Sequence, residues 1–414
     1  MQRTKIHIVG GGAFGLSTAL SLSKRGFANI TVYDRESIPA EDASSTDISK
    51  AVRMEYGDDI IYQQMAVASM KQWKLWNSHA KEIGFPVLYH ETGVFMVSEK
   101  GQPGSYETVS KESILKAGYS AYVEDNKDIS PDRFPGLKSM REKMPKGHYN
   151  RLGGWQRVNI VTGKKGTLKK LRKTDGQYSG IEMEDGTYHE GFVILCLGAW
   201  SESIIPEMKG LVQAIGQPVL HFKLTPELEN LYLKNFCVWT ADLAKTGFYG
   251  FPSNDGRLKI ANHGAGYTFH QNGVSTPKTV KTHPNDGHKV PLEAIESTIK
   301  FTKEYLPEVS NCDVCFTRMC WYTDSFDGDF IVGRIPGQKG VMVATGGSGH
   351  AFKFLPVLGD IVADAMQGVE NPKTAKFKWR YPTDKVLTEA ARAPLPPFQL
   401  ENQATAGTLY KSKL

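Results

Sequence analysis

The sequence predicts a mixed α/β fold with two connected domains, one Rossmann-like and the other built on an inserted antiparallel sheet. Three observations support this prediction. A strand, a glycine-rich turn, a helix and a second strand follow one another in residues 5–34. Two later buried strands, at 193–200 and 340–349, each end in a glycine turn and are expected to rejoin the first unit. Between them, alternating apolar and polar residues from 217 to 259 are typical of antiparallel strands.

The first 34 residues are expected to form one βαβ unit. Its parts are an apolar strand at 5–9, a helix at 13–25 and a second strand at 30–33. In the turn, Gly10 permits the sharp bend, Gly12 lets backbone N–H groups approach a pyrophosphate, and Gly15 lets the helix pack on the strand. Asp34, about 20 residues after Gly15, is placed to accept hydrogen bonds from an adenosine ribose. The unit therefore predicts a dinucleotide site.

The later elements follow from the same periodicities. A helix is expected over 59–82, with Ile61, Met65, Trp73 and Trp76 on one core-facing side. The other expected elements are short strands and loops in 90–150, strands at 158–162 and 180–188, a helix at 291–305 and a helix at 355–366. The nucleotide-binding domain is expected to comprise 1–80, 150–215 and 315–390, the inserted substrate domain 81–149 and 216–314, and the C-terminal tail 391–414.

Composition argues against several classes of function. The formal net charge of the 414 residues is +6, but the lysines are scattered apart from a cluster at 164–173, so nucleic-acid binding is not expected. No apolar run reaches the roughly 20 residues of a membrane span, and Met1 leads directly into a strand, so we expect a soluble, intracellular protein. The five cysteines suit free thiols rather than disulfides. Cys312 and Cys315 have metal-ligand spacing, but no second ligand pair follows, so no metal is expected.

Three further motifs resemble those of a known family. They are Ser44-Ser-Thr-Asp-Ile-Ser-Lys-Ala-Val-Arg53, Arg318-Met-Cys-Trp-Tyr-Thr323 and Gly346-Gly-Ser-Gly-His-Ala-Phe-Lys353. In this order they resemble the monomeric sarcosine oxidase family, which includes pipecolate and saccharopine oxidases and the fructosyl amino acid oxidases, or amadoriases. The resemblance covers nearly the whole chain. It implies a glutathione-reductase-like or D-amino-acid-oxidase-like fold that binds FAD, joined covalently through a thioether to Cys320.

The resemblance also implies a catalytic set. Its members are Lys259, Lys50, Arg53, Lys353, Tyr249 and His263. Lys353 and Arg53 match the family's carboxylate anchors, and a fixed cationic pair orients an amino acid toward the flavin. Tyr249 matches an aromatic substrate wall. Lys259 matches an oxygen-activating lysine, whose ammonium stabilises the negative charge that develops as oxygen is reduced.

A wider set is expected to hold the FAD. Its members are Gly10, Gly12, Ala13, Phe14, Gly15, Asp34, Arg35, Ser44, Ser45, Lys50, Val158, Gly198, Trp200, Cys320, Gly347, Gly349, His350, Phe352 and Lys353. In the family the position of Val158 meets the adenine through its backbone, and Lys50 stands at the position where relatives carry a basic residue over the flavin ring. The helix after His350 is expected to direct its N-terminal N–H groups at the anionic end of the reduced flavin.

The resemblance implies an FAD-dependent oxidase of a secondary amino acid, such as saccharopine, pipecolate or an N-methyl amino acid. Hydride passes to flavin N5, the substrate becomes an imine, and O₂ is reduced to H₂O₂. One alternative is a fructosyl amino acid oxidase, but amadoriases carry an acidic pair near the position of Asn262 and His263 that this chain lacks. A second alternative is a biosynthetic oxidase that cyclises an N-methyl aromatic amino acid.

A departure from the family motivates an alternative of another class. Relatives have a helix of roughly five turns before the strand at Val158, whereas only Gln156 and Arg157 stand there in this chain, although a parallel crossover needs about a dozen residues. A deleted exon, an engineered truncation or a wrong gene model would each produce this gap. A non-catalytic flavin-binding remnant is therefore the remaining alternative, and it would be colourless or unstable.

The last three residues are a targeting signal of their own. Ser412-Lys413-Leu414 follows a polar, proline-containing stretch and matches the C-terminal peroxisomal import signal. We therefore expect binding to the peroxisomal import receptor and a peroxisomal location, which suits an enzyme that releases peroxide. Relatives suggest a monomer.

Overall fold

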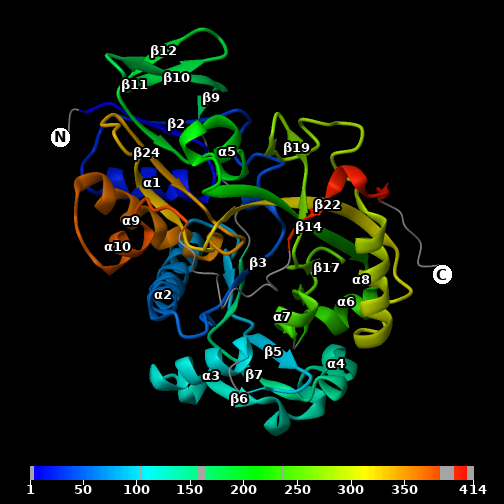
Figure 1. The fold of residues 1–414 in the computed structure, drawn as a ribbon. Coiled ribbons are helices and arrows are strands. Elements are labelled where there is room, and N and C mark those ends of the chain that lie inside the picture. Colours follow the sequence, from blue (N-terminus) through cyan, green and yellow to red (C-terminus); the bar gives the residue numbers. More distant parts are fainter. Residues whose placement is uncertain (1–3, 103–104, 157–163, 235, 383–395, 408–414) are drawn as a thin grey trace.

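The computed structural model describes residues 4–102, 105–156, 164–234, 236–382 and 396–407. Two lobes lie side by side, one around a six-stranded sheet and the other around a ten-stranded sheet (Figure 1). The predicted mixed α/β class is confirmed, because one sheet is mainly parallel and the other mainly antiparallel. In the described part of the chain, no helix combines the length and the apolar character that crossing a membrane requires.

The six-stranded sheet contains the predicted βαβ unit. Its order is β23 (Ile331–Arg334), β24 (Val341–Thr345), β13 (Phe192–Leu195), β1 (Ile6–Val9), β2 (Ile30–Asp34) and β9 (Lys164–Lys165), and only β23 runs antiparallel to its neighbour. Helix α1 (Ala13–Lys24) connects β1 to β2 and packs along α9 (Leu355–Gln367). The crossing is tight, because a Cβ at Gly359 would overlap the carbonyl oxygen of Ser17. Helix α10 (Pro372–Phe377) follows beside α9 (Figure 1).

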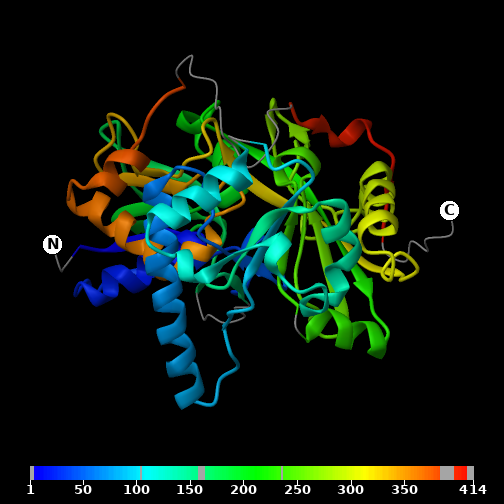
Figure 2. The same ribbon diagram turned by 90° about the horizontal axis from the view of Figure 1, so that it is seen from below.

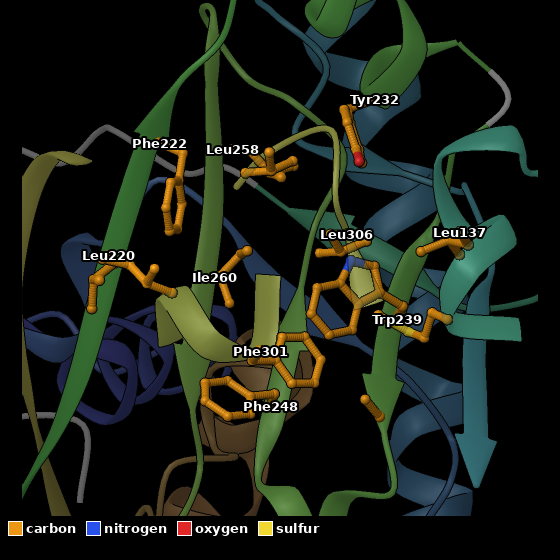
Figure 3. Packing of buried hydrophobic residues seen from close by; sticks show 14 of the residues in the cluster. Leu137, Leu220, Phe222, Tyr232, Trp239, Phe248, Leu258, Ile260, Phe301 and Leu306 are labelled. Carbon is orange, nitrogen blue, oxygen red and sulfur yellow. The ribbon is translucent and has the colours of Figure 1, made fainter. Parts of the chain in front are cut away.

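The ten-stranded sheet belongs to the inserted lobe. Its order is β25 (Phe398–Gln399), β18 (Tyr267–Thr268), β14 (Val212–Lys223), β17 (Arg257–Asn262), β16 (Phe248–Gly250), β15 (Val238–Ala241), β5 (Val94–Ser98), β7 (Lys146–Asn150) and β6 (Val123–Asp125), and β22 (Val314–Ser325) pairs with β14. Helix α8 (Leu292–Tyr305) covers one face (Figure 1). Figure 3 shows the core there, where the Phe301 ring stacks 4.3 Å from Phe248 and 5.8 Å from Trp239.

Shorter elements complete the molecule. A three-stranded sheet pairs β3 (Lys50–Val52) and β4 (Tyr89–His90) with β8 (Gly154–Gln156), and a second one contains β10 (Leu168–Thr174), β11 (Gln177–Met183) and β12 (Tyr188–Glu190). The two-stranded pairs are β19 (His270–Gln271) with β20 (Val274–Ser275), and β21 (Val290–Pro291) with β26 (Thr405–Ala406). The remaining α-helices are α2 (Ile60–Glu82), α3 (Tyr106–Lys116), α4 (Lys138–Lys143), α5 (Ser201–Ile204), α6 (Pro226–Leu233) and α7 (Leu243–Thr246). Figure 2 shows the end of α2 projecting from the body.

The expected division into domains cuts through continuous strands. The boundary after residue 215 falls inside β14, and the one before 315 falls one residue into β22. These two strands pair along nearly their whole length, which places both in the ten-stranded sheet. The boundary after 149 likewise falls within β7. The strand expected at 158–162 lies outside the described residues.

Candidate active site

A cavity of about 490 Å³ lies where the two lobes meet. The glycine turn, the segment from 40 to 53 and the turns after β13 and β24 line it from the side of the six-stranded sheet. Strands β15, β16, β17 and β22 line it from the other sheet. Segments far apart in the sequence therefore contribute to one site.

The glycine turn leaves room for a pyrophosphate. A Cβ at Gly10 would overlap the carbonyl oxygen of Cys196, and one at Gly15 would overlap that of Gly10, so both glycines are required for close packing. At Gly12 the nearest atom to a Cβ would be Ser45 Oγ at 3.8 Å, which leaves the cavity side open. No side chain caps α1 at Gly12, and its first N–H groups therefore face the cavity without an intrahelical acceptor. The residues fit a bound dinucleotide.

Charged groups after β2 complete the nucleotide end. Asp34 Oδ2 accepts a hydrogen bond of 2.7 Å from the backbone N–H of Gly11, which fixes the carboxylate beside the turn. Arg35 forms an ion pair of 2.5 Å with Asp42 and lies over the ring of Trp200, 4.6 Å from its centroid. Asp34, Arg35, Asp42 and Trp200 line the cavity, whereas Gly11 stands in the turn.

Two lysines and one aspartate of the lining form a cluster in which Asp47 and Lys259 are buried and Lys50 is half-buried. Asp47 Oδ2 accepts a 2.5 Å bond from Lys259 Nζ, and the backbone oxygen of Asp47 accepts a 2.6 Å bond from Lys50 Nζ. The ammonium of Lys259 also donates to the Ser49 carbonyl at 2.7 Å, so one of its three N–H groups remains for the cavity. Lys50 Nζ lies 4.3 Å from the centroid of the Phe352 ring.

Burial and neighbouring charges set the protonation of this cluster. Burial alone would raise the pKa of Asp47, but Lys259 and then Arg318 outweigh it and hold that pKa well below its usual range. Burial lowers the pKa of Lys50 to about 7, against the opposing effect of Asp47. Cys320, on β22, lines the same part of the cavity, and burial raises the pKa of its thiol. Lys50 is therefore a cation that changes charge near neutral pH.

Arg53 and Lys353 form the second cationic group. Lys353 Nζ donates to the Tyr56 hydroxyl at 2.9 Å and to the His350 carbonyl at 2.8 Å. Arg53 donates to the Tyr106 hydroxyl at 2.7 Å and to the backbone oxygen of Glu55. Both cations lie over the Tyr56 ring, at 5.0 Å and 5.3 Å from its centroid. Among the described residues neither has a carboxylate within ion-pair distance.

Aromatic rings also line the cavity. Tyr249, on β16, has its hydroxyl 3.4 Å from that of Tyr322, on β22, and its ring packs edge-on against Phe251. The His263 ring lies 5.8 Å from the Tyr322 ring. All four side chains line the cavity. Burial raises the pKa of Tyr249 above its ordinary value, so its hydroxyl is protonated at neutral pH.

Comparison with known proteins assigns the chain. Residues 5–365 match the family described as FAD dependent oxidoreductase. The chain is 30% identical to L-saccharopine oxidase of Schizosaccharomyces pombe, over 92% of this chain and 96% of that protein. It is 24% identical to N-methyl-L-tryptophan oxidase of Salmonella agona, with 89% and 95% covered. A fructosyl peptide oxidase of Aspergillus nidulans superposes with a TM-score of 0.84 at 25% identity, with 98% and 99% covered.

The chain belongs to the FAD-dependent oxidoreductase family. It is an FAD-dependent amine oxidoreductase, and the expected resemblance is confirmed. When bound, FAD would have its pyrophosphate held at Gly12, where the first N–H groups of α1 have no side-chain cap.

In the structure of this FAD-dependent amine oxidoreductase, nearly all the predicted site residues lie at one cavity. Those that line it are Lys259, Lys50, Arg53, Lys353, Tyr249, His263, Gly10, Gly12, Ala13, Phe14, Asp34, Arg35, Ser44, Ser45, Gly198, Trp200, Cys320, Gly347, Gly349, His350 and Phe352. Gly15 packs against the turn instead of facing the cavity. Val158 lies outside the described residues. Helix α9 begins at Leu355, after a single turn of 3-10 helix at Phe352–Phe354.

Sequence reasoning missed several groups of the oxidoreductase site. Asp47 and Tyr322 lie inside the quoted motifs, but nothing local marks an aspartate in a loop or a tyrosine in a strand as part of a site. Tyr56 and Tyr106 are recognised only through their bonds to Lys353 and Arg53. A buried cation needs oxygen acceptors around it. That requirement was the one signal in the sequence that could have indicated partners for Lys259, Lys353 and Arg53.

Proposed function

We propose that this FAD-dependent amine oxidoreductase oxidises a secondary amino acid to an imine and passes the electrons to O₂, which is released as H₂O₂. The observation that carries the proposal is the pair of buried cations, Arg53 and Lys353, at the cavity. Burial, with the positive charge of Arg53 next, lowers the pKa of Lys353 well below its ordinary value. A substrate carboxylate would offset the cost of burying both cations.

The residues around the pair define what a bound amine would experience. A carboxylate held by Arg53 and Lys353 fixes one end of the substrate, and the Tyr249 and Tyr322 rings limit the directions in which the rest can extend. The two buried cations and the aromatic rings disfavour a positive charge on the amine and so favour its neutral form, which is the form that can be oxidised. Bound FAD supplies the acceptor for the hydride from the carbon next to nitrogen. Lys259 places a positive charge beside the site where oxygen is reduced.

A panel of amines tests the proposal. Under anaerobic conditions a secondary amino acid should bleach the flavin absorbance, and in air it should produce peroxide. Lys353→Met should raise KM by about 100-fold, because it removes one of two charge-assisted bonds to the carboxylate. Lys74→Met is the matched control, since Lys74 is exposed and forms its ion pair with Glu91, outside the cavity. A yellow protein that no amine bleaches would refute the proposal, and a colourless one would favour the non-catalytic remnant.

The flavin is proposed to be covalently bound to Cys320. Support comes from the position of this cysteine on β22, where it lines the cavity beside Lys50 and Lys259. The other four cysteines, Cys196, Cys237, Cys312 and Cys315, are free thiols in the structure, as Cys320 is, but only Cys196 among them also lines the cavity. Yellow colour that stays in an acid-precipitated pellet would support the bond, and colour released to the supernatant would refute it.

A peroxisomal location is proposed from Ser412-Lys413-Leu414. A fluorescent protein fused to the N-terminus should collect in punctate organelles that contain catalase. Removal of the last three residues should make the fluorescence diffuse. A punctate pattern that survives the truncation would refute recognition of this tripeptide by the import receptor.

A further inference from the structure

The charges around the cavity are almost fully accounted for by one another. Three carboxylates line it, and each has a partner: Asp34 binds the glycine turn, Asp42 binds Arg35, and Asp47 binds Lys259. All three stand on the segment from β2 to β3. Among the described residues, no carboxylate lines the wall that β15, α7 and β16 provide. That wall therefore offers no counter-charge to a second ammonium group on a substrate.

Most of the cations that line the cavity also have a partner. Of the cations that line the cavity, Arg35 and Lys259 each bind a carboxylate, and Lys50 binds the Asp47 carbonyl. Arg53 and Lys353, which both lie over the Tyr56 ring, have no carboxylate within ion-pair distance among the described residues. They suit one carboxylate. No third cation stands on the wall of β15, α7 and β16 in the described residues. A substrate with further carboxylates would place them against a wall that offers no ion-pair partner among the described residues.

The wall itself is mainly apolar and aromatic, and the buried hydroxyl of Thr240, on β15, is its polar group besides the Tyr249 hydroxyl. Val238 and Leu243 are buried side chains that line the cavity, and Phe251 and Tyr249 present rings to it. Val238 and Phe251 also belong to one packed cluster with Trp155, so this surface is held rigidly rather than by a mobile loop. Binding of an apolar or aromatic group against such a surface is favourable, whereas binding of a charged group there is unfavourable.

We propose that the substrate is a secondary amine with a single carboxylate and an uncharged aromatic or apolar side chain, and that polycarboxylates such as saccharopine and cationic conjugates such as fructosyl-lysine are excluded. This inference rests on the proposed function, because it assumes that Arg53 and Lys353 bind the substrate carboxylate. It differs from the activity named for the relative that is 30% identical.

A substrate series tests the proposal on the wild-type holoenzyme. N-methyl-L-phenylalanine, N-methyl-L-tryptophan and L-pipecolate are compared with L-saccharopine, N-methyl-L-glutamate and fructosyl-lysine by anaerobic flavin reduction and by peroxide release. We expect kcat/KM to be about 100-fold higher or more for the first group, because the second group must hold a charge against a wall with no ion-pair partner. Preference for saccharopine or fructosyl-lysine would overturn the inference but leave the proposed function intact. Failure of every amine would overturn both.

Binding without turnover gives an independent measurement. Phenylacetate and glutarate lack the amine, and their dissociation constants follow from the change in the flavin absorbance. Phenylacetate should bind at least about 10-fold more tightly. Leu243→Lys should shift the preference toward glutarate and N-methyl-L-glutamate, whereas Leu233→Lys, at a leucine 51% exposed on α6, should not. Tighter binding of glutarate to the wild-type protein would contradict the inference even if the Leu243 variant does not fold.

Discussion

Asp47 bonds to two of the lysines in the cavity, one through its carboxylate and the other through its carbonyl oxygen. Asp47→Asn keeps the shape and the carbonyl but removes the charge, which leaves Lys259 buried beside a neutral amide. We expect a loss of about 3–5 kcal/mol in the free energy of unfolding at pH 7, measured by chemical denaturation. Asp360→Asn is the matched control, since Asp360 is 61% exposed and 3.9 Å from Arg25, and it should change little.

The pH dependence of the Asp47 effect has a definite sign. The pKa of Asp47 is held below its value in the unfolded chain, about 3.9, so the ionised carboxylate stabilises the fold above that pH. The contribution is lost as the pH falls below about 4 toward the folded-state pKa. The stability difference between wild type and Asp47→Asn should therefore narrow as the pH falls. A difference that is constant from pH 7 to pH 3 would contradict the assigned charge.

Lys50 should titrate near neutral pH. Its pKa of about 7 results from burial, with Asp47 and Cys320 opposing the shift and Lys259 and Arg318 adding to it. The visible spectrum of the bound flavin should therefore change with a midpoint near pH 7, with Lys50 charged below it and neutral above it. The transition should vanish in Lys50→Met and persist in Lys71→Met, at an exposed lysine of α2. A transition that survives in Lys50→Met belongs to another group.

At the level of elements, the crossing of α1 and α9 connects packing to cofactor binding. Ser17 Oγ donates to the Leu355 carbonyl at 2.6 Å and accepts from the Gly359 N–H at 2.6 Å. Gly359→Ala would force the helices apart and displace the N-terminus of α1, which faces the pyrophosphate site. We expect lower thermal stability together with a lower flavin content, measured as the ratio of absorbance at 450 and 280 nm.

Gly84→Ala separates backbone strain from displacement of the helices. Gly84 has a φ of +71°, and nothing lies within 4 Å of an added Cβ. It stands after α2, so the substitution should lower stability by about 1 kcal/mol without changing the flavin content. Equal flavin loss in both variants would show that general destabilisation, rather than the position of α1, controls cofactor binding.

The same elements show how far sequence reasoning reaches. Helices α1, α2, α8 and α9 and strands β1, β2, β13 and β24 lie within a few residues of their predicted positions, because each is set by local periodicity and by glycines. The pairing of β14 with β22 could not be predicted, since a strand's pattern does not name its partner. For the same reason Asp47 was missed, as its partner Lys259 is 212 residues away.

The whole molecule places the two ends of the proposed cofactor site on different sheets. Gly12 and Asp34 belong to the six-stranded sheet and its turns, whereas Cys320 and Lys259 belong to the ten-stranded sheet (Figure 1). FAD attached through Cys320 would therefore connect the two lobes covalently at one end and through many hydrogen bonds at the other. Such a connection stabilises only the folded protein.

Cys320→Ser should therefore lower the thermal stability of the whole molecule as well as change the attachment of the flavin. We expect acid-extractable flavin and a melting temperature several degrees lower, falling further as the protein is diluted, because flavin that is not covalently bound dissociates. Cys315→Ser is the matched control: it changes a half-buried thiol on the same strand, away from the cavity, and should keep both the covalent flavin and the melting temperature. If the two variants melt alike while only Cys320→Ser releases flavin, the thioether does not hold the lobes together, and its role is confined to the flavin itself.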